Sequence, residues 1–275
     1  MKLYKKENKI LIQNEELLYS LADQDWDTFI NDDQLFEKIQ SAIAGATPLG
    51  AKDFRGIQPP IAGQELWASG VTYFRSKQGR EEESKETGGA VFYTKVYDAP
   101  RPELFFKATK NRISGTDQAV RIRRDSSWNV PEPELTLFAT ANGKIVGYTI
   151  GNDMSSRDIE GQNPLYLPQA KTYDGCAGLG PCIYVPKTPL EVALEIQLTI
   201  ERNSIVVFEE SISTDRMKRK PQELVDYLFR ESSFPNGAFL MTGTGIVPPP
   251  DFTLELGDTI HINIEKIGTL TNTVE

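Results

Sequence analysis

Residues 130–158 read VPEPELTLFATANGKIVGYTIGNDMSSRD, and this stretch decides how the rest of the chain is interpreted. Two apolar, alternating runs flank Asn142-Gly143, a dipeptide typical of a two-residue β-hairpin loop, because both positions of that turn must tolerate a positive φ. A loop of only these two residues sets the register of the whole ribbon. In that register Glu132 faces Asp153 on the opposite strand.

Three acids are therefore expected on one side of the hairpin. Glu134 shares a face with Glu132 because side chains alternate along a strand. Directly opposed residues lie about 5 Å apart at Cβ, and like charges so close repel one another unless a cation lies between them. An all-oxygen set favours Mg²⁺, with Mn²⁺ or Ca²⁺ as alternatives, over zinc. The spacing leaves a second interpretation open, in which Glu132, Glu134 and Asp153 are solvated acids on an outer face.

The composition is that of a globular protein. The chain has 275 residues, of which 39% are hydrophobic and 25% charged, enough for one large core. A net charge of −9 without clustered Lys and Arg argues against a nucleic-acid partner. No apolar run reaches the roughly 18 residues of a membrane span, and Cys176 and Cys182 do not have the spacing of a disulfide framework. We expect a cytoplasmic protein with no membrane partner.

Two structural units are predicted. Residues 1–60 show short alternating strands and then an amphipathic helix, and the Gly/Pro-rich joint GIQPPIAGQ follows. Residues 61–275 are mainly strand-patterned, with strands expected at 90–97 and 103–108 and one helix at 221–231. The fold class is therefore α+β, mainly β, with a small N-terminal α+β domain and a larger second domain.

Several motifs, in the same order, resemble the fumarylacetoacetate hydrolase superfamily. They are VPEPEL, GYTIGNDMSSRDIEG, LPQAKTYDGCAGLGPCI, FLMTGTGIVPP and LELGDTIHINIEKIGTL, and the likeness runs from about Trp67 to the C-terminus. The resemblance implies a mixed β-roll or β-sandwich catalytic domain behind a small N-terminal domain. It also implies a divalent metal held by Glu132, Glu134 and Asp153, the trio to which the hairpin register points.

One departure from the family pattern narrows the implied function. The carbon–carbon hydrolases of the family carry a histidine three residues after the tyrosine of an N-Y-x-x-H-like segment, whereas GVTYFRSKQGREEE has Ser76 there. The only histidine, His261, alternates with isoleucines on an expected strand, as a surface or structural residue does. The segments VTYFRSK, YDAPRPELFFKA and SSRDIEGQNPLYLPQAK instead resemble the sugar-acid branch, that of the 2-keto-3-deoxy-D-arabinonate dehydratases.

That branch implies a metal-dependent hydro-lyase for a 2-keto-3-deoxy sugar acid. Such a 2-keto acid can chelate the ion through its carboxylate and C2 carbonyl, and the ion stabilises the enolate formed when C3 loses a proton. Water then leaves from C4, and tautomerisation gives 2,5-dioxopentanoate. Acylpyruvate or diketone hydrolysis, 2-oxoacid decarboxylation and a metal-binding module with degenerate chemistry stay open as alternatives.

Two residues are candidates for the catalytic chemistry. Glu103 begins a predicted strand, on the face that also carries Phe105 and Lys107, and is the acid/base candidate. Its alternative role is a salt-bridged acid at a strand end. Lys171 matches the lysine that family members place near substrate and metal, where a positive charge assists an anion and an enolate. Its alternative is a plain surface lysine.

Four residues are candidates for substrate binding. Arg157 matches a family arginine after the metal aspartate, as support for a ligand or as a substrate contact, and its alternative role is a structural ion pair. Thr244 belongs to a TGTG segment, whose glycines let the backbone approach a ligand, with a simple turn as the alternative. Arg75 and Ser76 are placed to meet a carboxylate or hydroxyls of the substrate.

The run RSKQGREEESKETGG, residues 75–89, carries eight charges and no apolar anchor. Its default interpretation is a solvated helix or loop, and our hypothesis is a mobile lid with glycines as hinges. The expected strand GGAVFYTK, residues 88–95, and the late strands offer surfaces for self-association. Because members of the family tend to oligomerise, the resemblance implies a homo-oligomer, dimer or tetramer.

Overall fold

The structure is a computed structural model of the chain and describes residues 1–83, 90–190 and 193–275. Its strands are β1 (Lys2–Lys6), β2 (Lys9–Asn14), β3 (Leu17–Ala22), β4 (Glu65–Gly70), β5 (Glu103–Thr109), β6 (Ile113–Ser114), β7 (Gln118–Val120), β8 (Asn129–Val130), β9 (Pro133–Ala139), β10 (Ile145–Asp153), β11 (Ser155–Ser156), β12 (Ala177–Tyr184), β13 (Glu195–Arg202), β14 (Ile205–Ser213), β15 (Ala238–Met241), β16 (Thr259–Ile264) and β17 (Gly268–Val274). The helices are α1 (Trp26–Ile30), α2 (Leu35–Ile43), α3 (Phe74–Glu83), α4 (Ala90–Asp98), α5 (Arg157–Gln162), α6 (Leu167–Lys171) and α7 (Pro221–Leu228), with 3₁₀ turns at Lys110–Arg112, Pro164–Tyr166 and Thr214–Arg216.

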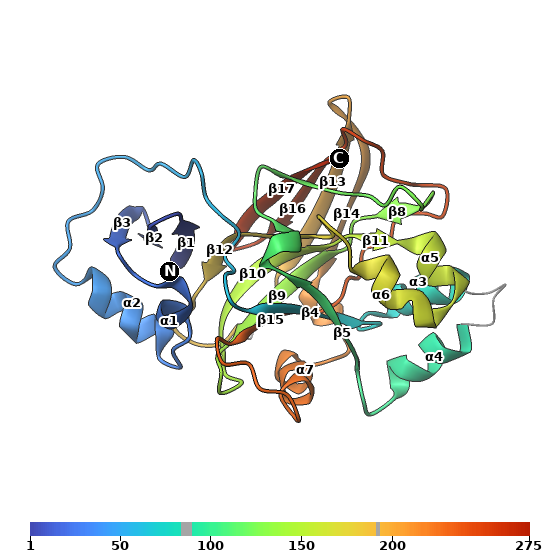
Figure 1. The fold of residues 1–275 in the computed structure, drawn as a ribbon, viewed down its shortest axis with the longest axis horizontal. Coiled ribbons are helices and arrows are strands. Elements are labelled where there is room, and N and C mark those ends of the chain that lie inside the picture. Colours follow the sequence, from blue (N-terminus) through green and yellow to red (C-terminus); the bar gives the residue numbers. More distant parts are fainter. Residues whose placement is uncertain (84–89, 191–192) are drawn as a thin grey trace.

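Two sheets dominate the molecule (Figure 1). The larger has the order β3-β2-β1-β12-β10-β9-β15-β4-β5, with β6 beside β12, and the smaller has the order β14-β13-β16-β17-β7. A core lies between them, where Leu137 and Ile150 of the large sheet belong to the same apolar cluster as Ile196, Leu198 and Ile262. This arrangement confirms the predicted α+β class, mainly β, with sheets packed as layers.

The β9–β10 hairpin turns differently from the prediction. Thr140 donates its N–H to the carbonyl of Lys144, so residues 141–143 form a three-residue loop. Of the Asn-Gly pair only Gly143 has a positive φ, +74°. A left-handed residue at the end of a three-residue loop is the usual partner of a type I turn. The predicted two-residue loop is therefore wrong.

The register at the far end of the same hairpin is nevertheless the predicted one. A bulge between Ile145 and Gly147 inserts one residue into β10 and compensates for the longer loop. The N–H of Asp153 donates to the carbonyl of Glu132 at 2.9 Å. Glu132 and Asp153 therefore do face each other across the ribbon.

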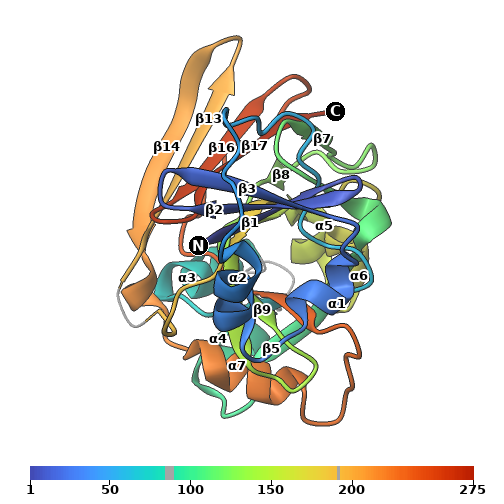
Figure 2. The same ribbon diagram turned by 90° about the vertical axis from the view of Figure 1, so that its left-hand side faces the viewer.

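The N-terminal strands continue the large sheet. In Figures 1 and 2, β1–β3 lie at one end of the molecule, and β1 pairs with β12 through Leu3 and Ile183. Leu3 and Ile12 also share an apolar cluster with Phe138 and Phe239 of the larger unit. The contact between residues 1–60 and the rest of the chain is thus built from both backbone pairing and core packing. Their division into two domains stays a prediction.

Residues 90–97, predicted as a strand, are helical instead and belong to α4. Their aromatic and β-branched side chains have strand propensity. In the structure Tyr93 is buried, whereas Val91 and Phe92 are exposed. Strand alternation would place residues 91 and 93 on one face, but here they differ in burial. Packing of one helical face overrides the local propensity, and the prediction is wrong.

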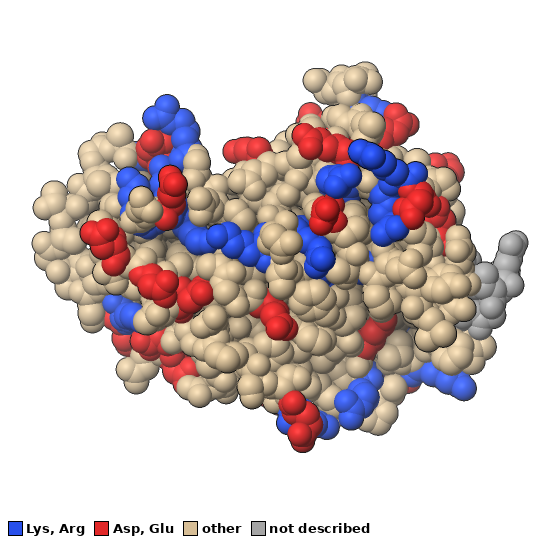
Figure 3. Space-filling view, in the orientation of Figure 1, with Lys and Arg blue, Asp and Glu red and all other residues tan. Residues whose placement is uncertain are grey.

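The surface carries mixed charge on the face drawn in Figure 3, where Lys and Arg side chains are interspersed with Asp and Glu. Within the three described ranges, none of the helices has the length and apolar character needed to cross a membrane.

Two leucines of the N-terminal strands test whether residues 1–60 unfold together with residues 61–275. Leu3 is 0% exposed and Leu17 is 48% exposed. We expect Leu3→Ala to destabilise the protein by about 2–5 kcal/mol, because it leaves a cavity in the shared core. Leu17→Ala, the control, should cost within about 0.5 kcal/mol. Thermal unfolding by circular dichroism should show one transition that Leu3→Ala shifts as a whole. A separate early transition that alone moves would contradict this.

Candidate metal centre

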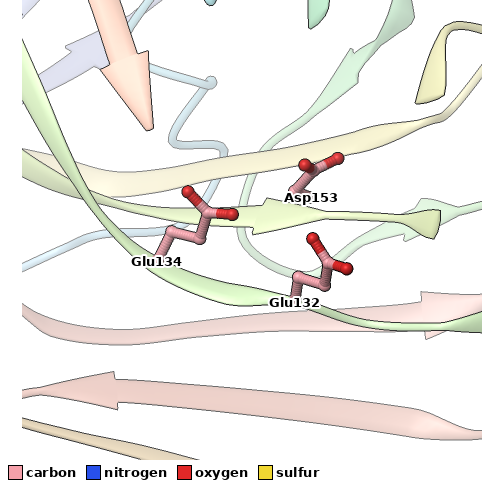
Figure 4. Close-up of side chains that lie close together, drawn as sticks. All are labelled: Glu132, Glu134 and Asp153. Atoms are coloured by element: carbon pink, nitrogen blue, oxygen red, sulfur yellow. The ribbon is translucent and has the colours of Figure 1, made fainter. Parts of the chain in front are cut away.

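Three buried acids meet at the open end of the β9–β10 hairpin. Glu134 lies in β9, Glu132 directly precedes that strand, and Asp153 is the last residue of β10. One carboxylate oxygen from each lies within 4.8 Å of the other two. Figure 4 shows the three carboxylates gathered at one place. Since each residue is at most 4% exposed, the alternative of solvated acids on an outer face is wrong.

Lys171 and Arg157 lie against these acids, as expected for a site. The ammonium of Lys171, at the end of α6, donates to Glu132 Oε2 at 2.6 Å and to Asp153 Oδ2 at 3.0 Å. Arg157, at the start of α5, forms an ion pair with Glu132, with Nη2 to Oε1 at 2.8 Å. Both side chains are buried, so the alternative of a surface lysine is wrong for Lys171.

Two further cations in the centre received no role from the sequence. Lys107 of β5 places Nζ 2.6 Å from Asp153 Oδ1. Arg80 of α3 lies 3.5 Å from Glu132 Oε1 and pairs with Glu160, a buried acid of α5. The sequence contained a pattern that points to each of them. Lys107 shares a strand face with Glu103, and Arg80 follows Ser76 by four residues, about one helical turn.

The surrounding charges separate the pKa values of Glu132 and Glu134. Burial opposes ionisation of Glu132, but the positive charges of Lys171, Arg157 and Arg80 hold its pKa below the usual range. For Glu134, burial and then the negative charges of Asp153 and Glu132 raise the pKa well above the usual range. Glu134 is therefore the acid of the three at which negative charge is least compensated.

The donor set fits a hard divalent cation. Among the described residues, Glu134 has a hydrogen bond from the N–H of Gly243 but no ion pair. Gly243 has a φ of +91°, and a Cβ there would lie 2.0 Å from Thr72 Oγ1. Only glycine allows this approach. A cation beside Glu134 would supply the missing positive charge, and three carboxylates match the oxygen ligands of Mg²⁺, Mn²⁺ or Ca²⁺.

Glu103 lies next to this centre. It pairs with Gly70 between β5 and β4, and a Cβ on Gly70 would lie only 2.1 Å from Glu103 Oε2, so the carboxylate rests over bare backbone. Burial raises the pKa of Glu103. The cations Arg80 and Lys171 lower it, and the nearby acids of the centre raise it further. A carboxyl group with a raised pKa beside a metal centre suits acid–base chemistry.

The substrate-binding candidates divide into two groups. Ser76, Arg157 and Thr244 line a cavity over the three acids, together with Arg80. Arg75 is not among the lining residues and lies toward Glu210 of β14. Adjacent positions of a helix point about 100° apart, so Arg75 and Ser76 cannot both face the cavity. The structure thus places Arg80 where the sequence placed Arg75.

Two smaller expectations can be compared with the structure. His261 on β16 is partly exposed, with Nδ1 3.1 Å from Thr271 Oγ1, which agrees with the expected surface or structural residue. The proposed lid, residues 75–89, begins in α3, but residues 84–89 lie outside the described residues. Its mobility stays a prediction.

Comparison with known proteins gives a consistent result. Residues 72–275 match the family model described as fumarylacetoacetate (FAA) hydrolase, C-terminal. The chain is 50% identical over 218 residues to a probable 2-keto-3-deoxyxylonate dehydratase of Haloferax volcanii, covering 78% of this chain and 73% of that protein. It is 46% identical over 223 residues to the 2-dehydro-3-deoxy-D-arabinonate dehydratase of Saccharolobus solfataricus, covering 80% and 74% of the two chains.

The fold is shared with solved structures. A 2-keto-3-deoxy-D-arabinonate dehydratase complexed with magnesium and 2,5-dioxopentanoate superposes with a TM-score of 0.85 at 36% identity, over 100% of this chain and 99% of that one. Its apo form gives the same TM-score at 37% identity, with the same coverage. Both the sequence motifs and the layered sheets are thus accounted for. This chain belongs to the fumarylacetoacetate hydrolase family.

Proposed function

We propose that this protein is a divalent-metal-dependent hydro-lyase that removes water from a 2-keto-3-deoxy sugar acid, such as 2-keto-3-deoxy-D-arabinonate, to give 2,5-dioxopentanoate. The observation that carries the proposal is the buried cage of Glu132, Glu134 and Asp153 with Lys171 and Glu103 beside it. It is supported by the similarity to dehydratases of such acids, one of which holds magnesium and 2,5-dioxopentanoate.

The three acids would hold Mg²⁺, with Mn²⁺ or Ca²⁺ as alternatives. When bound, the cation would supply positive charge that stabilises the carboxylate of a 2-keto acid and the negative charge that develops on its C2 carbonyl oxygen. The ammonium of Lys171 adds a second positive charge at the same place. Arg157 holds Glu132 in position through its ion pair and also lines the cavity, where it can meet the substrate.

Glu103 is the proposed acid–base group. Its carboxylate takes a proton from C3, the C4–O bond then breaks, and a proton returned to the departing hydroxide makes the water molecule. A double bond between C3 and C4 remains. A proton then moves from C5 to C3, and the resulting enol becomes the aldehyde without net loss or gain of atoms. The raised pKa of Glu103 suits a group that both accepts and donates protons.

Ser76 fits dehydration better than hydrolysis. Its hydroxyl donates to the carbonyl of Tyr73 at 2.8 Å and accepts from the N–H of the same residue at 3.3 Å, so it is engaged by the backbone at the start of α3. A hydroxyl held in this way is not a general base for an attacking water. Dehydration needs no attacking water, because the hydroxyl that leaves belongs to the substrate.

The oligomeric state and the cellular location stay proposals from the sequence. A homo-oligomer, dimer or tetramer, is compatible with the exposed apolar side chains Ile205, Val206 and Val207 on β14. A cytoplasmic location agrees with Cys176 and Cys182 both being buried free thiols.

The reaction itself is tested by incubation with 2-keto-3-deoxypentonates and Mg²⁺. We expect an aldehyde product with loss of one water, detected by mass spectrometry and by an aldehyde-specific reagent. Two carbon fragments would indicate hydrolysis, and released CO₂ would indicate decarboxylation. If no substrate changes while the protein still binds Mg²⁺, the protein is a metal-binding module and the proposal is wrong.

Substitution Glu134→Gln tests the metal cage. In the wild type, Mg²⁺ at 100 times its Kd should stabilise the fold by about 2.7 kcal/mol, seen as a higher Tm. We expect the variant to lose this increase and to lose turnover, because a ligand charge is gone. Its Tm without metal should be unchanged or higher, since like-charge repulsion falls. Glu265→Gln, on an exposed position, is the control. A normal Mg²⁺ response in Glu134→Gln would contradict the assignment.

Substitution Glu103→Gln tests the acid–base role. We expect kcat to fall about 10²- to 10⁴-fold while the Mg²⁺-induced rise in Tm stays. Gly70→Ala should act in the same direction, because its new Cβ displaces the carboxylate of Glu103. Glu195→Gln is a matched control, since Glu195 also begins a strand but is exposed. Full turnover in Glu103→Gln would exclude it as the proton carrier.

A further inference from the structure

Arg80 and Glu160 form a buried ion pair beside the metal centre. Arg80 lies in α3 and is 6% exposed, and Glu160 lies in α5 and is 1% exposed. The guanidinium also lies 3.5 Å from Glu132 Oε1 and packs against the ring of Tyr93, 5.8 Å from the ring centre. Arg80 lines the cavity over the three acids, whereas Glu160 is not among the lining residues. The pair therefore holds a positive charge in the wall of the cavity.

Arg80 is also the cavity arginine next to Glu103. The carboxylate of Glu103 rests on Gly70, and Gly70 lines the same cavity as Arg80. Burial raises the pKa of Glu103, and among the charged groups Arg80 opposes this rise most. Arg157, the other arginine among the described lining residues, is paired with Glu132 at 2.8 Å instead. A positive charge thus lies beside the proposed acid–base group, at the surface that a substrate would meet.

We propose that Arg80 binds the hydroxyl group on C4 of the substrate and stabilises the negative charge that develops on its oxygen as water leaves, and that Glu160 is the positioning residue that holds Arg80 there. The proposal rests on the proposed function, in which Glu103 returns a proton to the departing hydroxide. The leaving oxygen must then lie within hydrogen-bonding reach of Glu103. Because Arg80 lines the cavity next to Glu103, the same oxygen comes within reach of the guanidinium.

The guanidinium supplies charge and hydrogen bonds but no proton. After Glu103 removes the C3 proton, the electron pair of the enolate forms the double bond between C3 and C4, and the electron pair of the C4–O bond leaves with the oxygen. The hydroxide takes the proton that Glu103 received, which gives water and restores the carboxylate. A guanidinium stays protonated and carries five N–H donors, so pairing with carboxylates is compatible with donating to a hydroxyl.

Glu160 competes with the other acids for the guanidinium. Glu132, a proposed metal ligand, and Glu103 both lie near Arg80, and a tight ion pair with either would engage a carboxylate that the reaction uses. Glu160 pairs with Arg80 and is itself fixed by Ser155, whose hydroxyl donates to Oε2 at 3.0 Å. Because an unpaired buried carboxylate is costly, the burial of Glu160 and the position of Arg80 depend on each other.

The test compares two reactions that share their first step. Dehydration of a 2-keto-3-deoxypentonate requires loss of the C4 hydroxyl, whereas exchange of the C3 hydrogens of 2-oxopentanoate with D₂O does not, because this acid has no hydroxyl on C4. In Arg80→Met with Mg²⁺, we expect dehydration to fall about 10²-fold or more and exchange to fall far less. Any change in the basicity of Glu103 affects both rates alike, because both begin with removal of a C3 proton. Equal falls in the two rates would overturn the proposal.

Two further variants separate this role from a contribution to folding. Arg202→Met is the matched control, since Arg202 also pairs with a buried acid, Asp258 at 2.8 Å, but lies at the end of β13 and is not among the lining residues. Its two rates should keep the wild-type ratio. Glu160→Gln should lower dehydration more than exchange, because the guanidinium keeps its charge but loses the acid that holds it. A wild-type ratio in Glu160→Gln would overturn the positioning role.

A crystal structure covers the case in which Arg80→Met does not fold or the wild type does not exchange 2-oxopentanoate. In Glu103→Gln with Mg²⁺ and a 2-keto-3-deoxypentonate, a nitrogen of Arg80 should lie within about 3.2 Å of the C4 oxygen. A guanidinium that contacts only the C1 carboxylate, or no substrate atom, would overturn the proposal. The proposed function fails differently: a wild type that releases no water from 2-keto-3-deoxypentonates refutes the dehydratase, whereas a dehydratase in which Arg80→Met lowers both rates equally refutes only the role of Arg80.

Discussion

The pairing of buried carboxylates with buried cations is the constraint on which this molecule depends. Glu132, Glu134 and Asp153 lie almost without solvent, where an uncompensated charge costs several kcal/mol. Lys171 and Lys107 are the cations that make such burial possible around Asp153. Glu134, without an ion pair among the described residues, is the point at which the balance is incomplete. A bound divalent ion would complete it, so the electrostatics of the fold and the proposed chemistry have the same origin.

The architecture serves this pairing by bringing separate parts of the chain together. The acids come from the β9–β10 hairpin, Lys107 from β5 at the edge of the large sheet, and Lys171 from α6. Arg80 of α3 and Arg157 of α5 come from helices on the same side of the molecule (Figure 1). Because the strands are paired by backbone hydrogen bonds, their side chains are held firmly, which is what an ion and its bound acid require.

Predictions from the sequence were wrong for the loop of the hairpin and for segments whose structure depends on packing against the rest of the chain. The two-residue loop at Asn142 was wrong, yet the bulge after Ile145 restored the register, so the predicted facing of Glu132 and Asp153 was right through two offsetting deviations. The helical state of residues 90–97 depends on a buried Tyr93 and was invisible to strand propensity. In α3, the side of the helix that faces the cavity is set by contacts with other elements, and only the structure shows that Arg80, one turn after Ser76, lines the cavity and Arg75 does not.

The sequence by itself determined the acids and their shared face, because strand alternation and hairpin pairing are local rules that need no knowledge of the rest of the chain. It also determined the family, through motifs that carry Lys171 and Arg157. Only the tertiary structure decided which cations surround the acids and which oxygens they occupy. Lys107 lies 46 residues from Asp153 along the chain, and contacts between such distant positions arise from sheet order and core packing, which no local pattern encodes.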